Sequence, residues 1–443
     1  MPLAPSLRSL VLLLLATPLV AQEGSPGGPI PVASLLARRA AFLTAMPKGI
    51  AMIESGKIKS VDGDFPQDAD YRESNDFLYL TGVESPGGRL IFIQQDSGST
   101  SGKMLLYLAP PPAKRDAWSA PRIYADTQAV RLTGLAADEI LPLPRVVMPP
   151  RAPGTPIPTT RPDPIQPVVD SLLTATALTR IDYRRTIGPL RAIKDADEIR
   201  RLRLASEISA EGHRAAMLNT RPGMWEYKIE AIVEYTFRRR GAERVGYPSI
   251  VGTGFNSTTL HYDLSRYQTK PGDVVLIDAA AEFGYYSADL TRTFPVSGKF
   301  TPRQKAIYEL VLGAQQAAID AVKPGVTLAT LNQIARAYIK EQGGTLCGAK
   351  SCDTYFIHGL SHMVGMNVHD VNPNFTELRP GMTFTIEPGV YLPEESLGVR
   401  IEDVILVTAN GSESLTNGAP RSVAEIEKLM AEGKKRGLAA LKP

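Results

Sequence analysis

The sequence predicts an α+β protein of two domains, the second of which is built from two similar halves. Its 443 residues are many for a single domain. Two segments repeat 102 positions apart: Arg221–Gly223 precedes a helix pattern that ends at Gly241, and Lys323–Gly325 precedes one that ends at Gly343. The apolar positions of the two helices also correspond. This repeat predicts a duplicated unit of two helices followed by strands, with a functional site between the halves.

The first domain is expected over residues 32–188. Two runs, Arg89–Gln94 and Met104–Leu108, have the apolar composition of buried strands and are bounded by glycine and proline. Prolines are dense over residues 141–167, which excludes a helix or a central strand and predicts an extended surface excursion. The second domain is expected over residues 189–443. It opens with a long amphipathic helix from Asp195 to Leu218.

The first 21 residues are typical of a secretory signal peptide. Arg8 supplies a positive charge, an apolar run follows, and the small residue Ala21 suits cleavage. A retained membrane anchor is the alternative, but the run is short for a span and Pro18 interrupts it. Residues 22–31 are rich in glycine, proline and serine and predict a flexible linker. We therefore expect a secreted or periplasmic protein that has no membrane segment after cleavage.

The composition is that of a soluble globular enzyme, with 43% apolar and 21% charged residues. A net charge of +3 without a long Lys/Arg run gives no support to nucleic acid as a partner. The two cysteines, Cys347 and Cys352, are close enough to form a disulfide, which export favours; two free thiols are the alternative. Two sulfurs alone are too few for a structural zinc site.

Two aspartates occur in strand-like surroundings. Asp278 ends an apolar run, where burying a carboxylate is costly unless it is paired or bound to a metal. Asp289 lies in an alternating stretch, residues 287–293, that predicts the next antiparallel strand. A hairpin over Gly284 would bring the two carboxylates together. Either aspartate could instead pair with an arginine such as Arg292.

The five histidines are unevenly distributed. His358, His362 and His369 lie within twelve residues, and His261 precedes Asp278 by seventeen. Imidazole is a common metal ligand, so this concentration beside paired carboxylates indicates a metal site. The spacing of His358 and His362 would suit a helix, but the glycines around them favour a turn and a strand. His213, on the polar side of a predicted helix, is expected to be an ordinary surface residue.

Two glutamates complete the set of candidate ligands. Glu387 ends the run Met382–Ile386, and Glu402 lies on one face of the alternating run Gly398–Val404. Taken singly, each glutamate could be a charge on an edge strand.

The order of these residues, Asp, Asp, His, Glu and Glu, resembles that of the pita-bread metallopeptidases, which include methionine aminopeptidase, prolidase and aminopeptidase P. The segment His358–Asp370 is similar to the signature of the proline-directed branch, and residues 285–295 and 385–391 are similar to its neighbouring motifs. Residues Tyr71–Gly82 are similar to part of the amino-terminal domain of aminopeptidase P. The resemblance implies a pita-bread domain with pseudo-two-fold halves, preceded by a smaller α/β domain.

The resemblance also implies a centre of two divalent metal ions. Asp278 would chelate one ion, and His362 and Glu387 would bind the other. Asp289 and Glu402 would bridge the two. One imidazole and four carboxylates form an oxygen-rich set that suits Mn²⁺, although Zn²⁺ or Co²⁺ could substitute. Such a pair of ions lowers the pKa of a bridging water and polarises a carbonyl group.

Further roles follow from the same resemblance. Glu387 would accept the water's proton and pass it to the leaving proline nitrogen. His369 and His261 would hydrogen-bond the substrate amide and the developing oxyanion. The residues implied in substrate binding are His358, Tyr391, Arg400 and, through orientation of a metal ligand, Tyr247. For the two tyrosines, core packing is the alternative.

The activity implied is release of the first residue from peptides that carry proline at the second position. The alternative is a prolidase, which splits only Xaa-Pro dipeptides. A creatinase-like hydrolase or a binding protein on the same fold is a third reading, against which all five ligands are present. The resemblance further implies a homo-oligomer, either a dimer or a tetramer.

Overall fold

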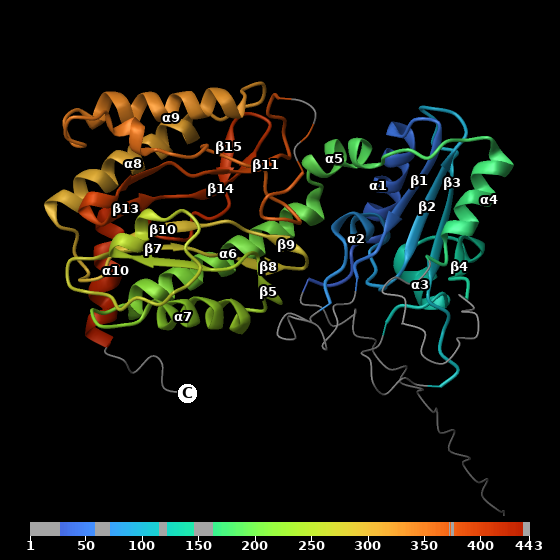
Figure 1. Ribbon diagram of the computed structural model, residues 1–443, viewed down its shortest axis with the longest axis horizontal. Coiled ribbons are helices and arrows are strands. Elements are labelled where there is room, and N and C mark those ends of the chain that lie inside the picture. Colours follow the sequence, from blue (N-terminus) through green and yellow to red (C-terminus); the bar gives the residue numbers. More distant parts are fainter. Residues whose placement is uncertain are drawn as a thin grey trace, which may run out of the picture.

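An amino-terminal sheet domain and a larger carboxy-terminal domain are joined by helix α5 (Arg184–Ala192) (Figure 1). The computed structural model describes residues 27–57, 71–114, 122–145, 163–371, 373 and 376–436. The expected signal peptide, residues 1–21, and the middle of the proline-dense stretch, residues 146–162, lie outside the described residues. Among the helices within those ranges, none combines the length and the apolar character needed to cross a membrane.

The amino-terminal domain is built on a sheet with the order β1-β2-β3-β4. The first three strands pair antiparallel, and β4 pairs parallel with β3. The strands span Gly49–Glu54 (β1), Arg89–Gln94 (β2), Lys103–Leu108 (β3) and Ile140–Pro142 (β4). The predicted strands in this domain are therefore confirmed, with one extra residue at the start of β3.

The proline-dense stretch does contain regular structure at both ends. It begins in the edge strand β4, where proline needs no partner for a ladder hydrogen bond. It ends in helix α4 (Gln166–Thr176), with Pro167 in the first turn. The prediction that no residue of 141–167 is helical is wrong at this end, because an N–H group in the first turn has no helical acceptor to lose.

Alternate residues of the strands pack on the two faces of this sheet, as the two-residue period of a strand requires. Ala51 and Ile53 belong to a core shared with helices α1 (Val32–Ala45), α2 (Asn75–Thr81) and α3 (Thr127–Thr133). Ile50 and Met52 pack on the opposite face, against Val169 of α4. The sheet is thus covered by helices on both sides.

The junction between the domains is ordered over its described residues. The expected boundary at residues 188/189 falls inside α5. Residues 27–31, which we expected to be flexible, contact the helix that follows α5 in the sequence. Arg200 of that helix donates to the carbonyl of Gly27 at 3.2 Å, and Arg201 donates to the carbonyl of Gly28 at 3.0 Å. Two arginine side chains thus bind carbonyl groups that this glycine-rich segment would otherwise present to water, while residues 22–26 of the expected linker lie outside the described residues.

The sequence repeat corresponds to two pairs of helices in the carboxy-terminal domain. The first pair is α6 (Ala196–Asn219) and α7 (Glu226–Arg239), and the second is α8 (Pro302–Asp320) and α9 (Leu328–Gly343). Helices α7 and α9 begin 102 positions apart and lie on opposite sides of the strands (Figure 1). Helix α10 (Val423–Arg436) packs against α6. The predicted duplication of a two-helix unit is confirmed.

Short antiparallel sheets lie between the helix pairs. Their strand orders are β10-β7-β6, β11-β14-β15, β12-β13 and β5-β8-β9. The first-half strands are β5 (Arg244–Val245), β6 (Ile250–Thr253), β7 (Val274–Asp278), β8 (Ala281–Phe283), β9 (Tyr286–Ser287) and β10 (Thr291–Pro295). The second-half strands are β11 (Thr383–Ile386), β12 (Gly389–Leu392), β13 (Leu397–Arg400), β14 (Asp403–Val407) and β15 (Ser412–Ser414). This arrangement gives each half its own strands against its own helices.

His213 is not a surface residue. It lies on α6 with no exposed area, and its Nε2 is 2.9 Å from the carbonyl oxygen of Ala279. The prediction is wrong because α6 is covered on several sides, by α7, α10 and the strands β8 and β9. A periodic pattern shows which face of a helix is polar, but it does not show that a second layer covers that face.

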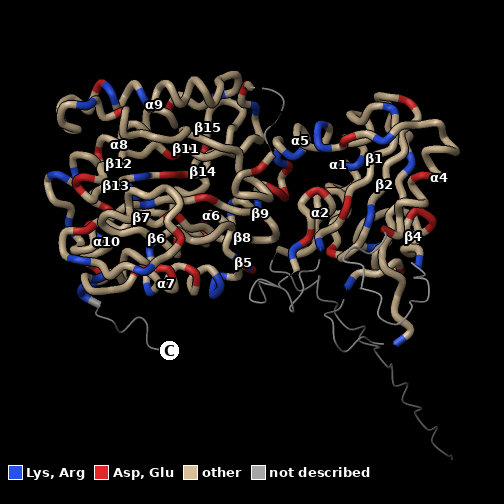
Figure 2. Tube along the Cα trace, in the orientation of Figure 1, with Lys and Arg blue, Asp and Glu red and all other residues tan. Residues whose placement is uncertain are grey.

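Two remaining expectations concern the surface and the cysteines. Lysine and arginine are interspersed with aspartate and glutamate over both domains, in keeping with the small net charge (Figure 2).

Cys347 and Cys352 form a disulfide that joins the segment after α9 to the short 3₁₀ helix η4 (Cys352–Tyr355). The preference for a disulfide over two free thiols is confirmed.

Candidate metal centre

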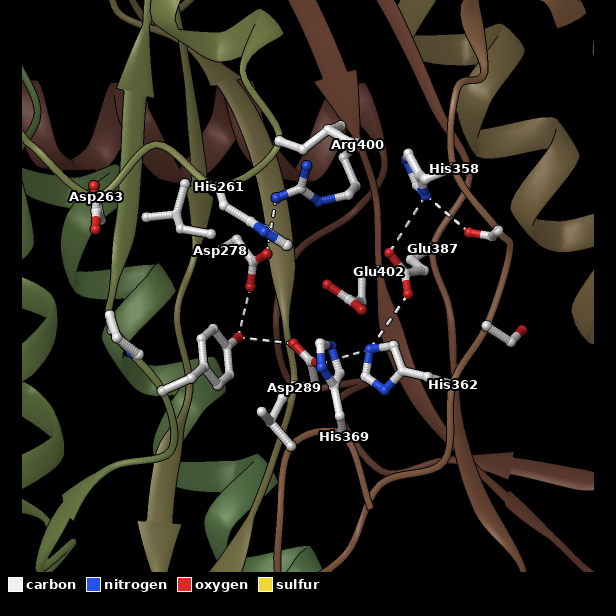
Figure 3. Close-up of a pocket in the computed structure, with 17 residues that line it drawn as sticks. His261, Asp263, Asp278, Asp289, His358, His362, His369, Glu387, Arg400 and Glu402 are labelled. Atoms are coloured by element: carbon white, nitrogen blue, oxygen red, sulfur yellow. Dashed lines mark hydrogen bonds and ion pairs between the residues drawn. The ribbon is translucent and has the colours of Figure 1, made fainter. Parts of the chain in front are cut away.

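A cavity of about 500 Å³ is lined by residues of both halves of the carboxy-terminal domain. Its lining includes every site residue named from the sequence except Tyr391. Ile250 and Leu260 contribute aliphatic surface to the lining. Asp278, Asp289, His362, Glu387 and Glu402 lie together in the middle of the site (Figure 3). The site predicted between two halves therefore exists as one concave pocket.

The two aspartates meet through strand pairing and a shared tyrosine. Strands β7 and β10 place Thr291 opposite Asp278, and Asp289 lies two residues before Thr291. The hydroxyl of Tyr247 lies 2.6 Å from Oδ1 of Asp278 and 2.7 Å from Oδ1 of Asp289 (Figure 3). Tyr247 thus touches both candidate ligands directly, so plain core packing is not its role.

The local structure around Asp289 differs from the prediction. Strands β8 and β9 do form a hairpin over Gly284. However, β9 ends at Ser287 and β10 begins at Thr291, so Asp289 lies between strands of different sheets. The expectation of one continuous strand over residues 287–293 is wrong, because the chain passes from one sheet to the other at this point.

The alternative pairing of an aspartate with Arg292 is also excluded. Arg292 is fully buried and donates to Asp403 at 2.7 Å. The partner of Asp278 is Arg400, whose Nη2 donates to Oδ2 at 2.8 Å. Successive residues of β10 point to opposite faces, so Arg292 faces away from the side on which Thr291 meets the pocket.

The two glutamates are each held by a threonine. Thr291 donates to Oε2 of Glu402 at 2.7 Å, and Thr385 donates to Oε1 of Glu387 at 3.0 Å. Glu387 follows β11 directly, as expected. Glu402 does not lie within a strand, because β13 ends at Arg400 and β14 begins at Asp403. The predicted continuous strand over residues 398–404 is therefore wrong.

Sequence reasoning did not single out either threonine. A signal was present for Thr385, which precedes Glu387 by two residues, the spacing that places side chains on one face of a strand. Short hydroxyl residues at that spacing from a buried carboxylate are natural hydrogen-bond donors to it. No such signal exists for Thr291, because its partner Glu402 is 111 residues away.

His362 completes a cluster with the bridging candidates. One ligand atom from each of Asp289, His362 and Glu402 lies within 4.8 Å of the others. Nε2 of His362 is 3.3 Å from Oδ2 of Asp289 and 3.4 Å from Oε1 of Glu387 (Figure 3). The segment from His358 to His369 is not helical, as the sequence analysis favoured, but the strand expected there is reduced to an isolated bridge between Met363 and Phe384.

The excess of negative charge in this cluster favours the binding of cations. Burial raises the pKa of Asp289 and of Glu402 above ordinary carboxyl values, and it raises the pKa of Glu387 to about 8. Burial alone would lower the pKa of His362, but hydrogen bonding and proximity to Asp289 raise it to about 9. Negative charge therefore exceeds positive charge here, which favours either bound protons or bound metal ions.

The contacts of the Tyr247 hydroxyl also indicate that the two aspartates need a further positive partner. This hydroxyl carries one proton, yet oxygens of both aspartates lie within hydrogen-bond distance of it. If both carboxylates are ionised, only one can accept this proton, and the other needs a different positive partner. An oxygen-rich set with one imidazole is a donor set for hard divalent ions. The residues present therefore fit a divalent metal centre.

The wall beyond Glu387 contains a linked set of polar side chains. The hydroxyl of Tyr391 is 2.8 Å from Nε2 of His358 and accepts from Nη1 of Arg400 at 3.0 Å. Nε of Arg400 also donates to Thr291 at 3.1 Å. Burial lowers the pKa of His358 to about 4, so its imidazole is neutral at physiological pH. Tyr391 is thus part of a polar network and not only of the core.

The other two histidines face the cavity. The rings of His362 and His369 lie 4.2 Å apart, edge to face. His261 and His369 are both exposed and line the cavity (Figure 3). The structure brings together all the histidines named as site residues, from two segments that are nearly a hundred residues apart in the sequence.

Comparison with known proteins identifies the two domains separately. The model of metallopeptidase family M24 matches residues 200–409, and the model of the aminopeptidase P amino-terminal domain matches residues 36–146. An Xaa-Pro dipeptidase of Pyrococcus furiosus is 40% identical over 234 residues, but this match covers 52% of the present chain and 64% of the dipeptidase. The similarity to a dipeptidase is therefore confined to about half of the chain.

Similarity to aminopeptidases extends over both domains. An Xaa-Pro aminopeptidase of Escherichia coli is 33% identical over 437 residues, which is 90% of this chain and 98% of that protein. The structure of aminopeptidase PepP from Pseudomonas aeruginosa matches with a TM-score of 0.79 and 33% identity, covering 92% of this chain and 99% of the other. The predicted pita-bread fold with a smaller domain before it is confirmed. The chain belongs to metallopeptidase family M24, in the group of the Xaa-Pro aminopeptidases.

Proposed function

We propose that this peptidase releases the first residue from peptides that carry proline at the second position. The carrying observation is the acidic cluster at one side of a single cavity, in a chain that matches Xaa-Pro aminopeptidases along both domains. The match to a dipeptidase covers 52% of the chain, whereas the match to an Xaa-Pro aminopeptidase covers 90%, which favours peptide trimming over dipeptide hydrolysis. All five candidate ligands are present, which argues against an inactive relative.

The metal centre would hold two divalent ions. Asp278 would bind one ion, His362 and Glu387 the other, and Asp289 and Glu402 would bridge them. The ligand set favours Mn²⁺, with Zn²⁺ or Co²⁺ able to replace it. Bound ions would supply a water of lowered pKa and would polarise the carbonyl of the scissile bond. Tyr247, which contacts both aspartates, would hold them in orientation.

Glu387 is the proposed general base. It accepts a hydrogen bond from Thr385 at 3.0 Å, which fixes one carboxylate oxygen and leaves the other available for proton transfer. That second oxygen is 3.7 Å from Nδ1 of His358, on the side of the pocket assigned to proline. Glu387 would accept the proton of the attacking water and deliver it to the proline nitrogen as the bond breaks.

The remaining cavity residues would bind the substrate. His261 and His369, which are exposed in the cavity, would donate to the substrate amide and to the developing oxyanion. His358 would contact the proline ring and the carbonyl that follows it. Tyr391, which does not line the cavity, would support this contact through its hydrogen bond with His358 at 2.8 Å. Arg400 has its donors engaged by Asp278, Thr291 and Tyr391, so it would act by holding these groups in place.

The test is hydrolysis by purified protein stripped of metal with a chelator and then reloaded. We expect no cleavage of an Xaa-Pro-Yaa tripeptide after chelation, and the best recovery with Mn²⁺. The change Glu387→Gln should lower kcat by about 10²–10⁴-fold, the range for loss of a general acid–base group. Glu394→Gln, an exposed glutamate seven residues later, is the matched control and should leave kcat unchanged.

Substrate choice separates the readings. An aminopeptidase should cleave Xaa-Pro-Yaa much faster than the dipeptide Xaa-Pro, and should reject Xaa-Ala-Yaa. Rapid turnover of the dipeptide alone would contradict the assignment and indicate a prolidase. Full activity after exhaustive chelation would contradict the metal mechanism itself.

Location and assembly complete the proposal. The signal-like first 21 residues and the disulfide both fit action in a secreted or periplasmic setting. Processing is checked by amino-terminal sequencing of protein recovered from the exported fraction, where retention of Met1 would contradict it. A homo-oligomer, either dimer or tetramer, is expected and is measured by light scattering during gel filtration.

A further inference from the structure

The segment that carries His362 and His369 lies at the boundary between the two domains and contacts both. We call residues 362–370 the catalytic loop. The side chains of Val364 and Met366 are buried in the same core cluster as Phe77 and Leu78 of helix α2. The same cluster contains Val404 and Leu406 of β14, and the N–H of Val364 donates to the carbonyl of Thr383 at 3.0 Å. The loop is thus part of the carboxy-terminal domain and also packs against the amino-terminal one.

Hydrogen bonds from the amino-terminal domain fix the backbone of this loop. The carbonyl oxygen of Met366 accepts from Nη2 of Arg72 at 2.9 Å and from Nδ2 of Asn75 at 3.3 Å. Arg72 is itself oriented by Glu282, to which its Nε donates at 2.9 Å. The middle of the loop is therefore held at a defined point.

The end of the loop is held by a buried group of charges. Asp370 follows His369 directly, and its carboxylate, 1% exposed, forms an ion pair with Arg191 of α5. Its second oxygen is 3.4 Å from Nζ of Lys194, whose side chain is fully buried. Arg191 also donates to Asp76 of helix α2 at 2.6 Å. Two anions and two cations thus connect α2, through α5, to the residue next to His369.

The free-energy cost of burying these four charges is high if their role is only to join the two domains. Taking two cations and two anions out of water costs several kcal/mol per ion before their attraction is counted, and apolar packing would join the domains as well. A network of charges fixes direction and distance, which apolar contacts do not. The loop is also closely packed, because a side chain at Gly365 would collide with the carboxylate of Asp370.

We propose that Asp370 is a positioning residue for His369, and that the amino-terminal domain acts through Asp76 and Arg191 to hold the catalytic loop in its working position. The ring of His369 lies beside that of His362, so a shift of the loop would move a substrate-binding group and a metal ligand together (Figure 3). The inference rests on the proposed function for its activity readout and has a second readout that does not.

The variant Asp76→Asn tests the coupling without touching the loop. Asn keeps the size of the side chain and removes the charge that Arg191 meets. The control is Asp195→Asn, which removes another ion pair between the domains, with Arg38 at 2.8 Å. In the part of the chain that the structure describes, neither Arg38 nor Asp195 is hydrogen-bonded or ion-paired to the loop, whereas the neighbouring Lys194, which stays unchanged, is. Asn also preserves the helix cap that Asp195 provides to α6. Both variants should lower the melting temperature by similar amounts.

Only Asp76→Asn should affect catalysis. We expect its kcat on an Xaa-Pro-Yaa tripeptide to fall about tenfold, the lower end for residues that support a ligand, with KM changed less than twofold. In a His369→Ala background the same change should lower kcat by clearly less than tenfold, because only its effect through His362 remains. Equal kcat values for Asp76→Asn, Asp195→Asn and the unaltered protein would overturn the inference. So would an undiminished effect in the His369→Ala background.

A separate readout keeps the inference apart from the proposed activity. Mn²⁺ should raise the melting temperature of the unaltered protein and of Asp195→Asn by the same amount, and that of Asp76→Asn by less, because His362 lies in the same loop. Absence of peptide cleavage by the unaltered protein would defeat the proposed function, while this comparison of metal-induced shifts would still decide the positioning role. Equal shifts in all three proteins would overturn it.

Discussion

Substitution of Glu226 tests whether hydrogen bonds to one buried carboxylate stabilise the segment that carries His261. Among the described residues, this carboxylate has no ion-pair partner. Glu226 lies in the first turn of α7 and has no exposed area. Five donors reach it, all from the segment 253–267, which carries His261. They are Thr253 N at 2.8 Å, Thr253 Oγ1 at 2.9 Å, Asn256 Nδ2 at 3.2 Å, Tyr262 OH at 2.9 Å and Tyr267 N at 2.8 Å.

The expected loss of stability follows from these donors. In Glu226→Ala, the backbone N–H groups of Thr253 and Tyr267 lose their acceptor, at about 1–3 kcal/mol each, so a loss of about 4 kcal/mol is expected. In Glu226→Gln, the amide oxygen can replace the carboxylate oxygen that serves Thr253. The amide nitrogen then faces the N–H of Tyr267, which stays unsatisfied, and the loss is about 2 kcal/mol.

Thermal unfolding measures the difference. For a domain of this size each kcal/mol shifts the melting temperature by about 2–4 °C, so we expect a fall of about 4–8 °C for Glu226→Gln and about twice that for Glu226→Ala. Glu341→Ala, an exposed glutamate on the repeat-related helix α9, is the control and should shift it by less than about 1 °C. A melting temperature for Glu226→Gln equal to that of the unaltered protein would refute the view that these hydrogen bonds secure the segment.

Three further outcomes are expected. Burial lowers the pKa of His213 to about 4, so below pH 6.5 the unfolded chain binds a proton that the folded one does not. About 3 kcal/mol of stability is therefore lost as the pH falls from 6.5 to 4; His213→Gln, which can still donate to Ala279, should flatten the plot of melting temperature against pH over this range. Replacing Cys347 and Cys352 together by alanine removes a cross-link five residues apart in sequence and should cost about 2 kcal/mol, measured by urea unfolding; an unchanged midpoint would contradict this. Tyr247→Phe keeps the ring but removes the hydroxyl shared by Asp278 and Asp289, so the affinity of metal-free protein for Mn²⁺ should fall about 10–100-fold in a calorimetric titration; unchanged affinity would show that the hydroxyl does not orient the ligands.

Much of the site could be predicted because its residue types conflict with their surroundings. Carboxylates at the ends of apolar strands, such as Asp278 and Glu387, need a compensating charge, and the histidines gathered within twelve residues offered metal ligation as the common explanation. The repeat likewise predicted two helix pairs, because each half needs an apolar helix face of the same period. These inferences depend on local pattern, which the sequence contains in full.

What could not be predicted depends on contacts between distant segments. His213 shows a polar pattern on its helix, yet other elements cover it. Asp289 and Glu402 fall in breaks between strands, and an alternating pattern does not show where a chain leaves one sheet for another. Thr291, which binds Glu402 from 111 residues away, and the charges around Asp370 show no pattern in the sequence and meet only in the folded chain.

The two halves of the domain are tied to each other at the metal centre itself. Asp278 of the first half accepts from Arg400 of the second at 2.8 Å, and Glu402 of the second half accepts from Thr291 of the first at 2.7 Å. Each carboxylate is therefore oriented by a donor from the opposite half. A rotation of one half against the other would break both bonds at once.

Arg292 and Asp403 follow Thr291 and Glu402 in the sequence and stabilise this arrangement from the opposite face of the strands. Their ion pair at 2.7 Å is fully buried, and Arg292 also donates to the carbonyl of Glu402 at 2.6 Å. The pocket thus has ligands on one face of the strands and a buried ion pair on the other. Of the candidate ligands, the first half supplies two aspartates and the second supplies a histidine and two glutamates. The amino-terminal domain donates hydrogen bonds to the loop that carries this histidine. We therefore predict that neither half alone would bind the ions.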